Sequence, residues 1–217
     1  MFFRKIFGKL LFSYIFRWKP KVEVSKNVLE RCVLIAAPHT SNWDYPITMS
    51  YMWSQKIKIS YTIKKEWMRF PLGIFFRFTG GVGIDRKPKN KGKKRLSMVE
   101  SISKLFGKHS KLCVIVPAEG SRSLRRRWKT GFYYIALTAS VPIVLGYLDY
   151  KTKIAGIGRV IHPTGNLYQD MTQIMKFYEG IQGKSPKQFA LDERFCSTPE
   201  NKTTQMDSDQ ETIETTV

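Results

Sequence analysis

The chain has 217 residues, a length that suits one domain with a buried core. Its net charge of +20 favours partners that carry negative charge, such as a membrane surface or a nucleic acid. Cys32, Cys113 and Cys196 are too few and too far apart for a disulfide framework or a zinc site, so we expect the chain to face the reducing cytoplasm.

Residues 1–18 interleave apolar and basic side chains. On a helix the two kinds fall on opposite sides: Arg4, Lys5, Gly8 and Lys9 against Phe3, Phe7, Leu10 and Tyr14. The charges interrupt the run of ~20 apolar residues that a membrane span requires. The pattern therefore predicts an amphipathic helix over residues 1–20 that lies in the interface of an anionic membrane.

Two alternatives remain for this segment. A secretory signal peptide would need small residues at a cleavage site, and the basic stretch of residues 17–21 is a poor substitute. An amphipathic helix that packs on the protein core has the same periodicity as an interfacial one.

An apolar run over residues 33–37 predicts a buried strand, which Pro38 ends. A helix is expected over residues 45–52, with Ser41 or Asn42 as its cap. Backbone N–H groups of the turn between them are expected to be free to hold an oxyanion.

His39 and Asp44 lie in or next to this turn. A neutral imidazole accepts a proton from a hydroxyl near pH 7, and a carboxylate on its other ring nitrogen fixes the tautomer. We therefore interpret His39 as a candidate general base that Asp44 orients. The alternative is a capping aspartate beside an unrelated loop histidine, because short motifs recur by chance.

The next expected elements are a strand over residues 56–63, helices over residues 67–78 and 96–106, and a buried strand over residues 112–116. Glu119, Gly120 and Arg122 follow that strand, at the end where open α/β sheets bind ligands. Gly120 permits a tight turn, and the guanidinium of Arg122 suits a phosphate or carboxylate. The alternative for Arg122 is a solvated loop charge.

Strands over residues 139–146 and 154–161 and a helix over residues 170–182 complete the order. Strands and helices alternate, which predicts an α/β fold: a single domain over residues 21–196 with a mostly parallel sheet flanked by helices. Residues 197–217 carry five acidic side chains against one lysine, and we expect a disordered acidic tail there.

Four blocks follow one another along the chain: HTSNWD at residues 39–44, GVGIDR at 81–86, EGSRS at 119–123 and VPIV at 141–144. In this order they resemble the lysophospholipid acyltransferase family typified by bacterial 1-acylglycerol-3-phosphate acyltransferase. Gly83 stands where many members carry an aromatic residue, and Ser121 stands where threonine is commoner. Each block alone is a weak signal, but four in the family's order are specific.

The resemblance implies transfer of a fatty acyl group from acyl-CoA or acyl carrier protein to a hydroxyl of a lysophosphatidate-like lipid. His39 would be the general base, oriented by Asp44, and the alcohol would attack the thioester without an acyl-enzyme. No metal and no cofactor beyond the acyl donor are implied. The acceptor and its phosphate would be bound by Arg86, Glu119, Gly120, Ser121 and Arg122.

Two other functions fit part of the pattern. A related O-acyltransferase with the same catalytic pair, the His39–Asp44 dyad, could act on another lipid head group, such as an amino-acid lipid or a lipid A precursor. A basic nucleic-acid or membrane-binding module would account for the charge, which gathers at residues 87–95 and 125–129, but not for the four blocks. We therefore expect a peripheral enzyme on the cytoplasmic face of the cell membrane, with no specific nucleic-acid partner.

Overall fold

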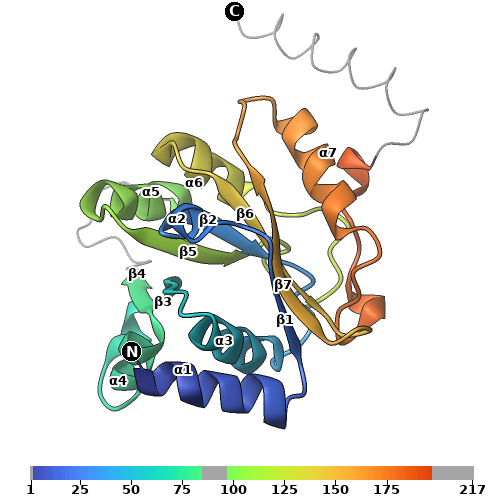
Figure 1. Cartoon of the computed structure of the whole chain (residues 1–217). Coiled ribbons are helices and arrows are strands. Elements are labelled where there is room, and N and C mark those ends of the chain that lie inside the picture. Colours follow the sequence, from blue (N-terminus) through green and yellow to red (C-terminus); the bar gives the residue numbers. More distant parts are fainter. Residues whose placement is uncertain (1, 85–96, 197–217) are drawn as a thin grey trace, which may run out of the picture.

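The computed structural model describes residues 2–84 and 97–196, which fold around a five-stranded sheet (Figure 1). Its strands are β1 (Lys19–Val22), β2 (Arg31–Ala36), β5 (Leu112–Pro117), β6 (Ile143–Asp149) and β7 (Ile154–Ile161). They lie in the order β1, β7, β6, β2, β5. Neighbouring strands are parallel except β6 and β7, which are antiparallel. The predicted acidic tail lies outside the described residues.

The strand β2 divides the core into two layers, because alternate side chains of a strand point to opposite faces. Val33 and Ile35 are buried with side chains of α5, α6 and α7, whereas Cys32 and Leu34 are buried with side chains of α3 and the N-terminal segment. These helices are α3 (Asp44–Ser54), α5 (Met98–Lys108), α6 (Gly131–Ala139) and α7 (Leu167–Tyr178). The prediction of a mostly parallel sheet flanked by helices is confirmed.

The N-terminal segment consists of α1 (Phe2–Lys9) and a π-helical turn, η1 (Leu10–Ile15), which pack against α3. A β-carbon on Gly8 would come within 2.7 Å of the β-carbon of Trp53 on α3, so glycine permits the close approach of the two helices. Phe12 is fully buried in the same contact. No helix within residues 2–84 and 97–196 is long and apolar enough to cross a membrane.

A second, two-stranded sheet is formed by β3 (Tyr61–Lys64) and β4 (Gly81–Ile84). A strand was expected from residue 56, but the residues before β3 have one bridge, from Ser60 to Val114 of β5. An extended stretch becomes a regular strand only where a neighbour pairs with it.

The helix expected over residues 67–78 is divided in two, η2 (Lys65–Met68) and α4 (Leu72–Thr79). Pro71 stands at the N-cap of α4. Proline has no N–H to donate, so it suits a helix start and breaks a helix interior. The remaining short elements are α2 (Lys26–Leu29), η3 (Pro186–Gln188) and η4 (Glu193–Phe195).

Candidate active site

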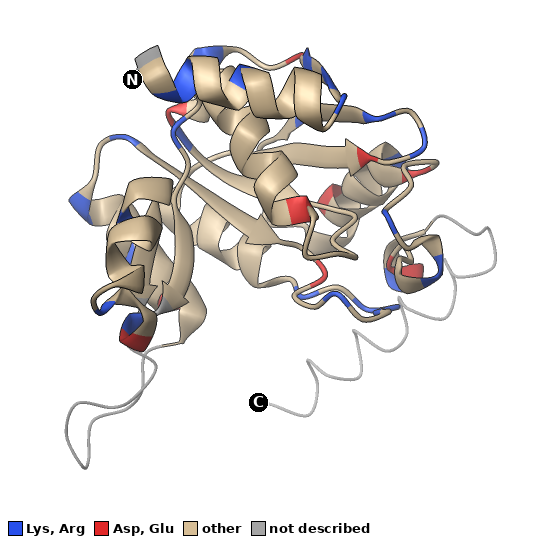
Figure 2. Ribbon diagram, turned by 90° about the horizontal axis from the view of Figure 1, so that it is seen from below, with Lys and Arg blue, Asp and Glu red and all other residues tan. Residues whose placement is uncertain are grey.

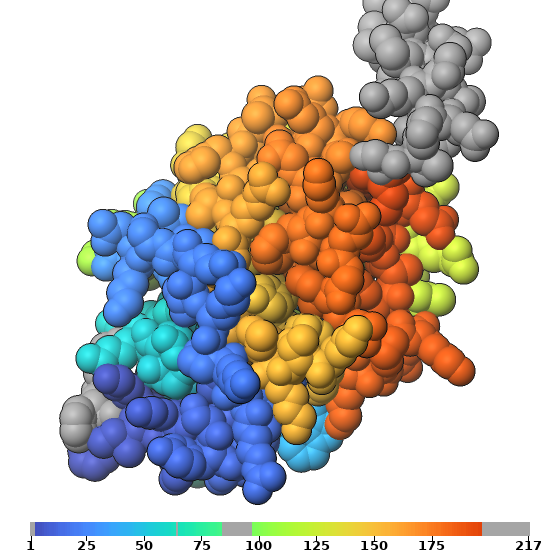
Figure 3. All heavy atoms as spheres, turned by 45° about the vertical axis from the view of Figure 1, so that its right-hand side comes forward, coloured from blue at the N-terminus to red at the C-terminus, as the bar shows by residue number. Residues whose placement is uncertain are grey.

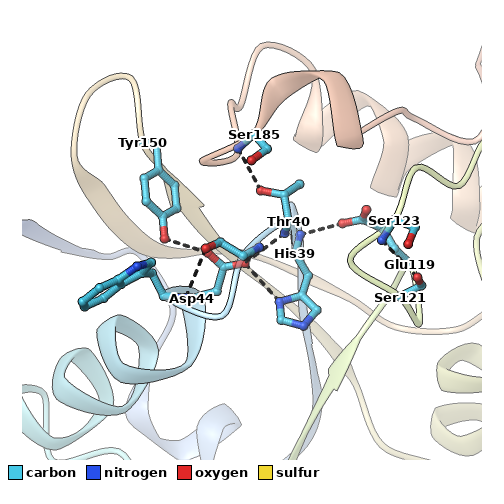
Figure 4. A network of polar contacts seen from close by, with 10 residues as sticks. His39, Thr40, Asp44, Glu119, Ser121, Ser123, Tyr150 and Ser185 are labelled. Carbon is cyan, nitrogen blue, oxygen red and sulfur yellow. Dashed lines mark hydrogen bonds and ion pairs between the residues drawn. The ribbon is translucent and has the colours of Figure 1, made fainter.

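Three loops meet at the carboxyl edge of the sheet, after β2, β5 and β6. His39 lies in the loop after β2, Glu119 follows β5, and Tyr150 follows β6, while Asp44 is the first residue of α3. Parallel neighbours end at one edge, so residues that are far apart in the sequence become adjacent. Figure 4 shows their polar groups directed toward the turn that holds His39.

The His39 ring and the Asp44 carboxylate form a pair, with Nδ1 3.1 Å from Oδ2. The same oxygen accepts the backbone N–H groups of Thr40 and Ser41, each at 2.9 Å. The other oxygen, Oδ1, accepts the hydroxyl of Tyr150 at 2.7 Å. Asp44 is only 5% exposed, so these donors replace the water that an ionised carboxylate would otherwise require. With Nδ1 held, Nε2 is the ring nitrogen left to meet a substrate.

The cap predicted for this turn is wrong, and the N–H groups predicted to hold an oxyanion are in part occupied. Neither Ser41 nor Asn42 caps α3: the N-cap is Trp43, without a side-chain cap bond, and the Ser41 hydroxyl accepts the N–H of Trp43. The backbone N–H groups of residues 39–41 donate to the two carboxylates of the site. They are therefore not free to hold an oxyanion.

Glu119 is fully buried and supports the backbone of the turn. Its Oε1 accepts the N–H of His39 at 2.6 Å, whereas its buried Oε2 has no hydrogen-bond partner among the described residues. Burial raises the pKa of Glu119 to about 7, and the nearby charge of Asp44 acts in the same direction, against the lowering effect of the His39 bond. The Glu119 carboxyl is therefore partly protonated near neutral pH.

The other predicted acceptor-binding residues lie in the loop after β5. Gly120 has a φ of +68°, in the left-handed region that favours glycine. The Ser121 hydroxyl accepts the N–H of Ser123 at 3.0 Å, so it stabilises the loop itself. Arg122 is exposed and lines the same cavity as the dyad. Arg86 lies outside the described residues.

A cavity of about 1010 Å³ extends from His39 and Asp44. Two cations, Arg122 and Lys129, line it near the loop after β5. Much of the remaining wall is apolar and comes from both core layers: Met49, Ile59, Ile102, Ile115, Phe132 and Ile135. A large apolar cavity with a few charged groups fits an amphiphilic ligand with a long chain and an anionic head.

The three cysteines are unpaired thiols in the structure. Cys32 and Cys113 face each other across β2 and β5, with their sulfurs 3.4 Å apart. In the described part of the chain, no group of three His, Cys, Asp or Glu side chains is placed to hold a metal ion.

Tyr150 is the site residue that sequence motifs did not identify. Its partner Asp44 is 106 positions away, and it belongs to none of the four blocks. One signal was available: Tyr150 directly follows β6, at the same sheet edge where the other strand-end motifs lie.

The chain is thus an α/β protein with a histidine–aspartate pair at the carboxyl edge of its sheet. The model of the Acyltransferase family matches residues 19–145, which is more than half of the chain. The chain belongs to this family. The resemblance stated from the four blocks, and the prediction of an O-acyltransferase, are confirmed.

A similar solved structure is that of PlsC, the 1-acyl-sn-glycerophosphate (LPA) acyltransferase from Thermotoga maritima. The TM-score is 0.50 at 19% sequence identity, and the match covers 80% of this chain and 74% of that chain. At this identity the likeness concerns the fold. A comparison of the sequence with curated proteins finds no match.

The raised pKa of Glu119 predicts that stability depends on pH. Between the ordinary glutamate pKa and about 7, the folded protein binds more protons than the unfolded chain, so the free energy of unfolding falls as pH rises. Glu119→Gln cannot titrate and keeps an oxygen for the N–H of His39. From pH 5 to 8 we expect the wild type to lose ~1–3 kcal/mol relative to this variant.

Urea unfolding at four pH values in that range measures the difference. The exposed Glu179→Gln is the control and should follow the wild type. If the Glu119→Gln and wild-type curves were parallel, the proton on Glu119 would have no effect on folding.

Proposed function

We propose that this protein moves a fatty acyl group from acyl-CoA or acyl carrier protein to the free hydroxyl of a lysophosphatidate-like lipid. The observation that carries the proposal is the His39–Asp44 pair on the wall of a large, mainly apolar cavity that Arg122 also lines. Such an acceptor brings an apolar chain, an anionic phosphate and a hydroxyl to one place. Membership of the Acyltransferase family supports the type of reaction.

His39 is the proposed general base. Its Nε2 takes the proton of the acceptor hydroxyl, and the oxygen attacks the thioester carbonyl. The tetrahedral intermediate then collapses: the carbon–sulfur bond breaks, the new ester remains, and the sulfur takes the proton from the imidazolium and leaves as a thiol. Because the alcohol attacks the thioester directly, no acyl-enzyme is needed. Asp44 stabilises the imidazolium and fixes the ring.

The proposed anion site for the acceptor's head group comprises Arg122 and Lys129. A β-carbon on Gly120 would come within 2.6 Å of the Lys129 side chain, so the lysine lies directly over this loop. Arg86 is included in this proposed anion site because of the family resemblance. Glu119, whose carboxyl is buried against the backbone of His39, would serve the acceptor by holding that turn.

Two exposed apolar segments support a membrane-facing surface, which we call the α1–α4 face. Its members are Phe3, Phe7, Leu10, Tyr14 and Ile15 of the N-terminal segment and Phe70, Leu72, Ile74, Phe75 and Phe78 in and beside α4. Trp53 joins the two, since its ring lies 6.1 Å from Phe7 and 5.9 Å from Phe78. Figure 1 shows α1 and α4 at the same corner of the molecule.

Basic side chains accompany the α1–α4 face. The guanidinium of Arg4 lies 3.9 Å from the Phe78 ring centre, and Lys5 and Lys9 are exposed on α1. Figure 2 shows Lys and Arg on α1 and on the unit that contains α4. Apolar burial with basic attraction suits an anionic bilayer, so we propose a peripheral protein on the cytoplasmic face of the membrane.

The first test concerns the dyad. His39→Ala removes the proton acceptor and little packing, so we expect the rate of acyl transfer to lysophosphatidate to fall by ~10²–10⁴ with the fold retained. Asp44→Asn should also be severe. His162→Ala, an exposed histidine after β7, is the control and should keep the wild-type rate. Initial rates are measured by mass spectrometry of the products. A rate of His39→Ala within about threefold of the wild-type rate would exclude His39 as the general base.

The second test concerns the head group. Arg122→Lys keeps the charge but loses the two-pronged donor, so kcat/KM for the acceptor should fall about tenfold while the KM for the acyl donor is unchanged. The exposed Arg159→Lys on β7 is the control. The phosphate role would be wrong if a panel of lysolipids showed a wild-type preference for acceptors without phosphate.

The third test concerns the membrane. Deleting residues 1–18 would also remove Phe12 and Trp18 from the core, so surface substitutions are needed. Leu10→Ser with Tyr14→Ser should weaken binding to anionic liposomes by at least about tenfold, because two apolar side chains no longer enter the bilayer. Activity on a detergent-dispersed short-chain acceptor should survive.

The matched control for the membrane test is Leu137→Ser with Tyr134→Ser, which makes the same changes at exposed positions of α6, away from the α1–α4 face (Figure 1). Liposome co-sedimentation should not change in this control. Equal losses in the two double variants would exclude the α1–α4 face as the membrane contact.

A further inference from the structure

The carboxylate of Asp44 is held from two sides. Its Oδ2 accepts the bonds that come from the turn itself, whereas Oδ1 is reached by Tyr150 from the other side of the sheet edge, at 2.7 Å (Figure 4). Three donors already restrain Oδ2. The Tyr150 hydroxyl holds the other oxygen, so it adds a restraint on rotation of the carboxylate about its Cβ–Cγ bond and helps to keep Oδ2 directed at the His39 ring.

Tyr150 is itself held firmly. Its backbone N–H donates to the carbonyl of Gln182 at 2.8 Å, and its ring meets the ring of Trp18 edge-on, with centres 4.8 Å apart. Burial, followed by the hydrogen bond to Asp44, raises the pKa of Tyr150 well above its ordinary value. The phenol therefore stays protonated and remains a donor at any working pH.

Trp18 connects this contact to the N-terminal segment. It is buried, and its backbone N–H donates at 3.0 Å to the carbonyl of Phe12, the residue that anchors η1 in the core. The backbone N–H of the following residue, Lys19, donates at 2.8 Å to the carbonyl of Lys153, at the end of the β6–β7 turn. Figure 3 shows blue atoms from the first part of the chain against the yellow-orange atoms of that turn.

We infer that Tyr150 is a positioning residue for the His39–Asp44 dyad and that Trp18, which is anchored to the N-terminal segment, holds Tyr150 in place. This inference rests on the proposed role of the dyad. Both residues lie outside residues 19–145, the part that the family model matches, one on each side. This part of the support for the dyad therefore comes from residues that the family model does not cover, whereas the bonds from Thr40, Ser41 and Glu119 lie within it.

The decisive variant is Tyr150→Phe, which keeps the ring against Trp18 and removes one hydroxyl. We expect kcat to fall about tenfold on a detergent-dispersed acceptor, because the hydrogen bond to the Asp44 carboxylate is lost. The KM values for acceptor and acyl donor should not change, because the proposed substrate-binding residues are not altered. Tyr133→Phe is the matched control: it removes another buried tyrosine–aspartate bond, 2.9 Å from Tyr133 to Asp170, and neither residue is among those that line the cavity beside the dyad. It should lower stability and leave kcat unchanged.

A second readout does not require the substrate. Nitrogen NMR of labelled histidine rings reports which ring nitrogen carries the proton, and His39→Ala assigns the signal among the three histidines. In the neutral wild type the proton should reside on Nδ1, toward Asp44. Tyr150→Phe should increase the other tautomer, and Tyr133→Phe should not.

Trp18→Phe is the second variant, and it provides the test in case Tyr150→Phe does not fold. It reduces the contact with the Tyr150 ring, so kcat and the tautomer should move in the same direction by a smaller amount, without any bilayer present. Wild-type kcat and a wild-type His39 signal in Tyr150→Phe would overturn the inference. If the wild type transferred acyl groups to no lysolipid, the proposed function would fail, while the NMR comparison would still decide the positioning role.

Discussion

Asp44 carries a carboxylate that is 5% exposed, and the loop after β2 folds around it. A buried charge without donors is costly, so the chain must deliver hydrogen bonds to it from several directions. Two come from backbone N–H groups of the turn, one from the His39 ring and one from Tyr150. The path of the turn and the orientation of the ring both depend on this one charge, which also accepts a hydrogen bond from Tyr150 in the β6–β7 turn.

The C-terminal part of the chain closes on the same turn. The N–H of Ser185 donates to the Thr40 hydroxyl at 3.2 Å, and a β-carbon on Gly183 would come within 2.7 Å of that oxygen. Lys184 lies over the Trp43 ring, 5.0 Å from its centre. The segment after α7 therefore packs directly on the turn that holds His39.

Much of the arrangement of the candidate site could be predicted because its residues lie at strand ends. The apolar runs before His39 and Glu119 indicated parallel strands, and parallel strands bring their carboxyl ends to one edge. Tyr150 could not be assigned in this way, since a tyrosine after a strand has many ordinary explanations and its contact with Asp44 is long-range. The occupied N–H groups of residues 39–41 could not be foreseen for a related reason: the turn's local pattern does not reveal that two carboxylates accept their bonds.

The N-terminal segment illustrates another limit of periodicity. Its pattern indicated two faces, but it could not decide whether the segment lies in a membrane interface or packs on the core. The structure shows core contact on one side, where Gly8 permits close approach to α3 and Phe12 is buried. Phe3 and Tyr14 remain exposed on another side. A π-helical turn at η1 shifts the residues that follow relative to an ideal helix, which a pattern based on 3.6 residues per turn cannot include.

The two carboxylates of the site differ in what their surroundings can support. Asp44 receives donors at both oxygens, which stabilise an anion. Glu119 receives one donor, the N–H of His39, and its pKa is raised to about 7 by burial and by the charge of Asp44. Two anions so close together repel each other, so ionised Asp44 favours a proton on Glu119. The site can therefore keep one fixed negative charge beside His39 while a second carboxyl, largely neutral below its pKa, holds the backbone of the same residue.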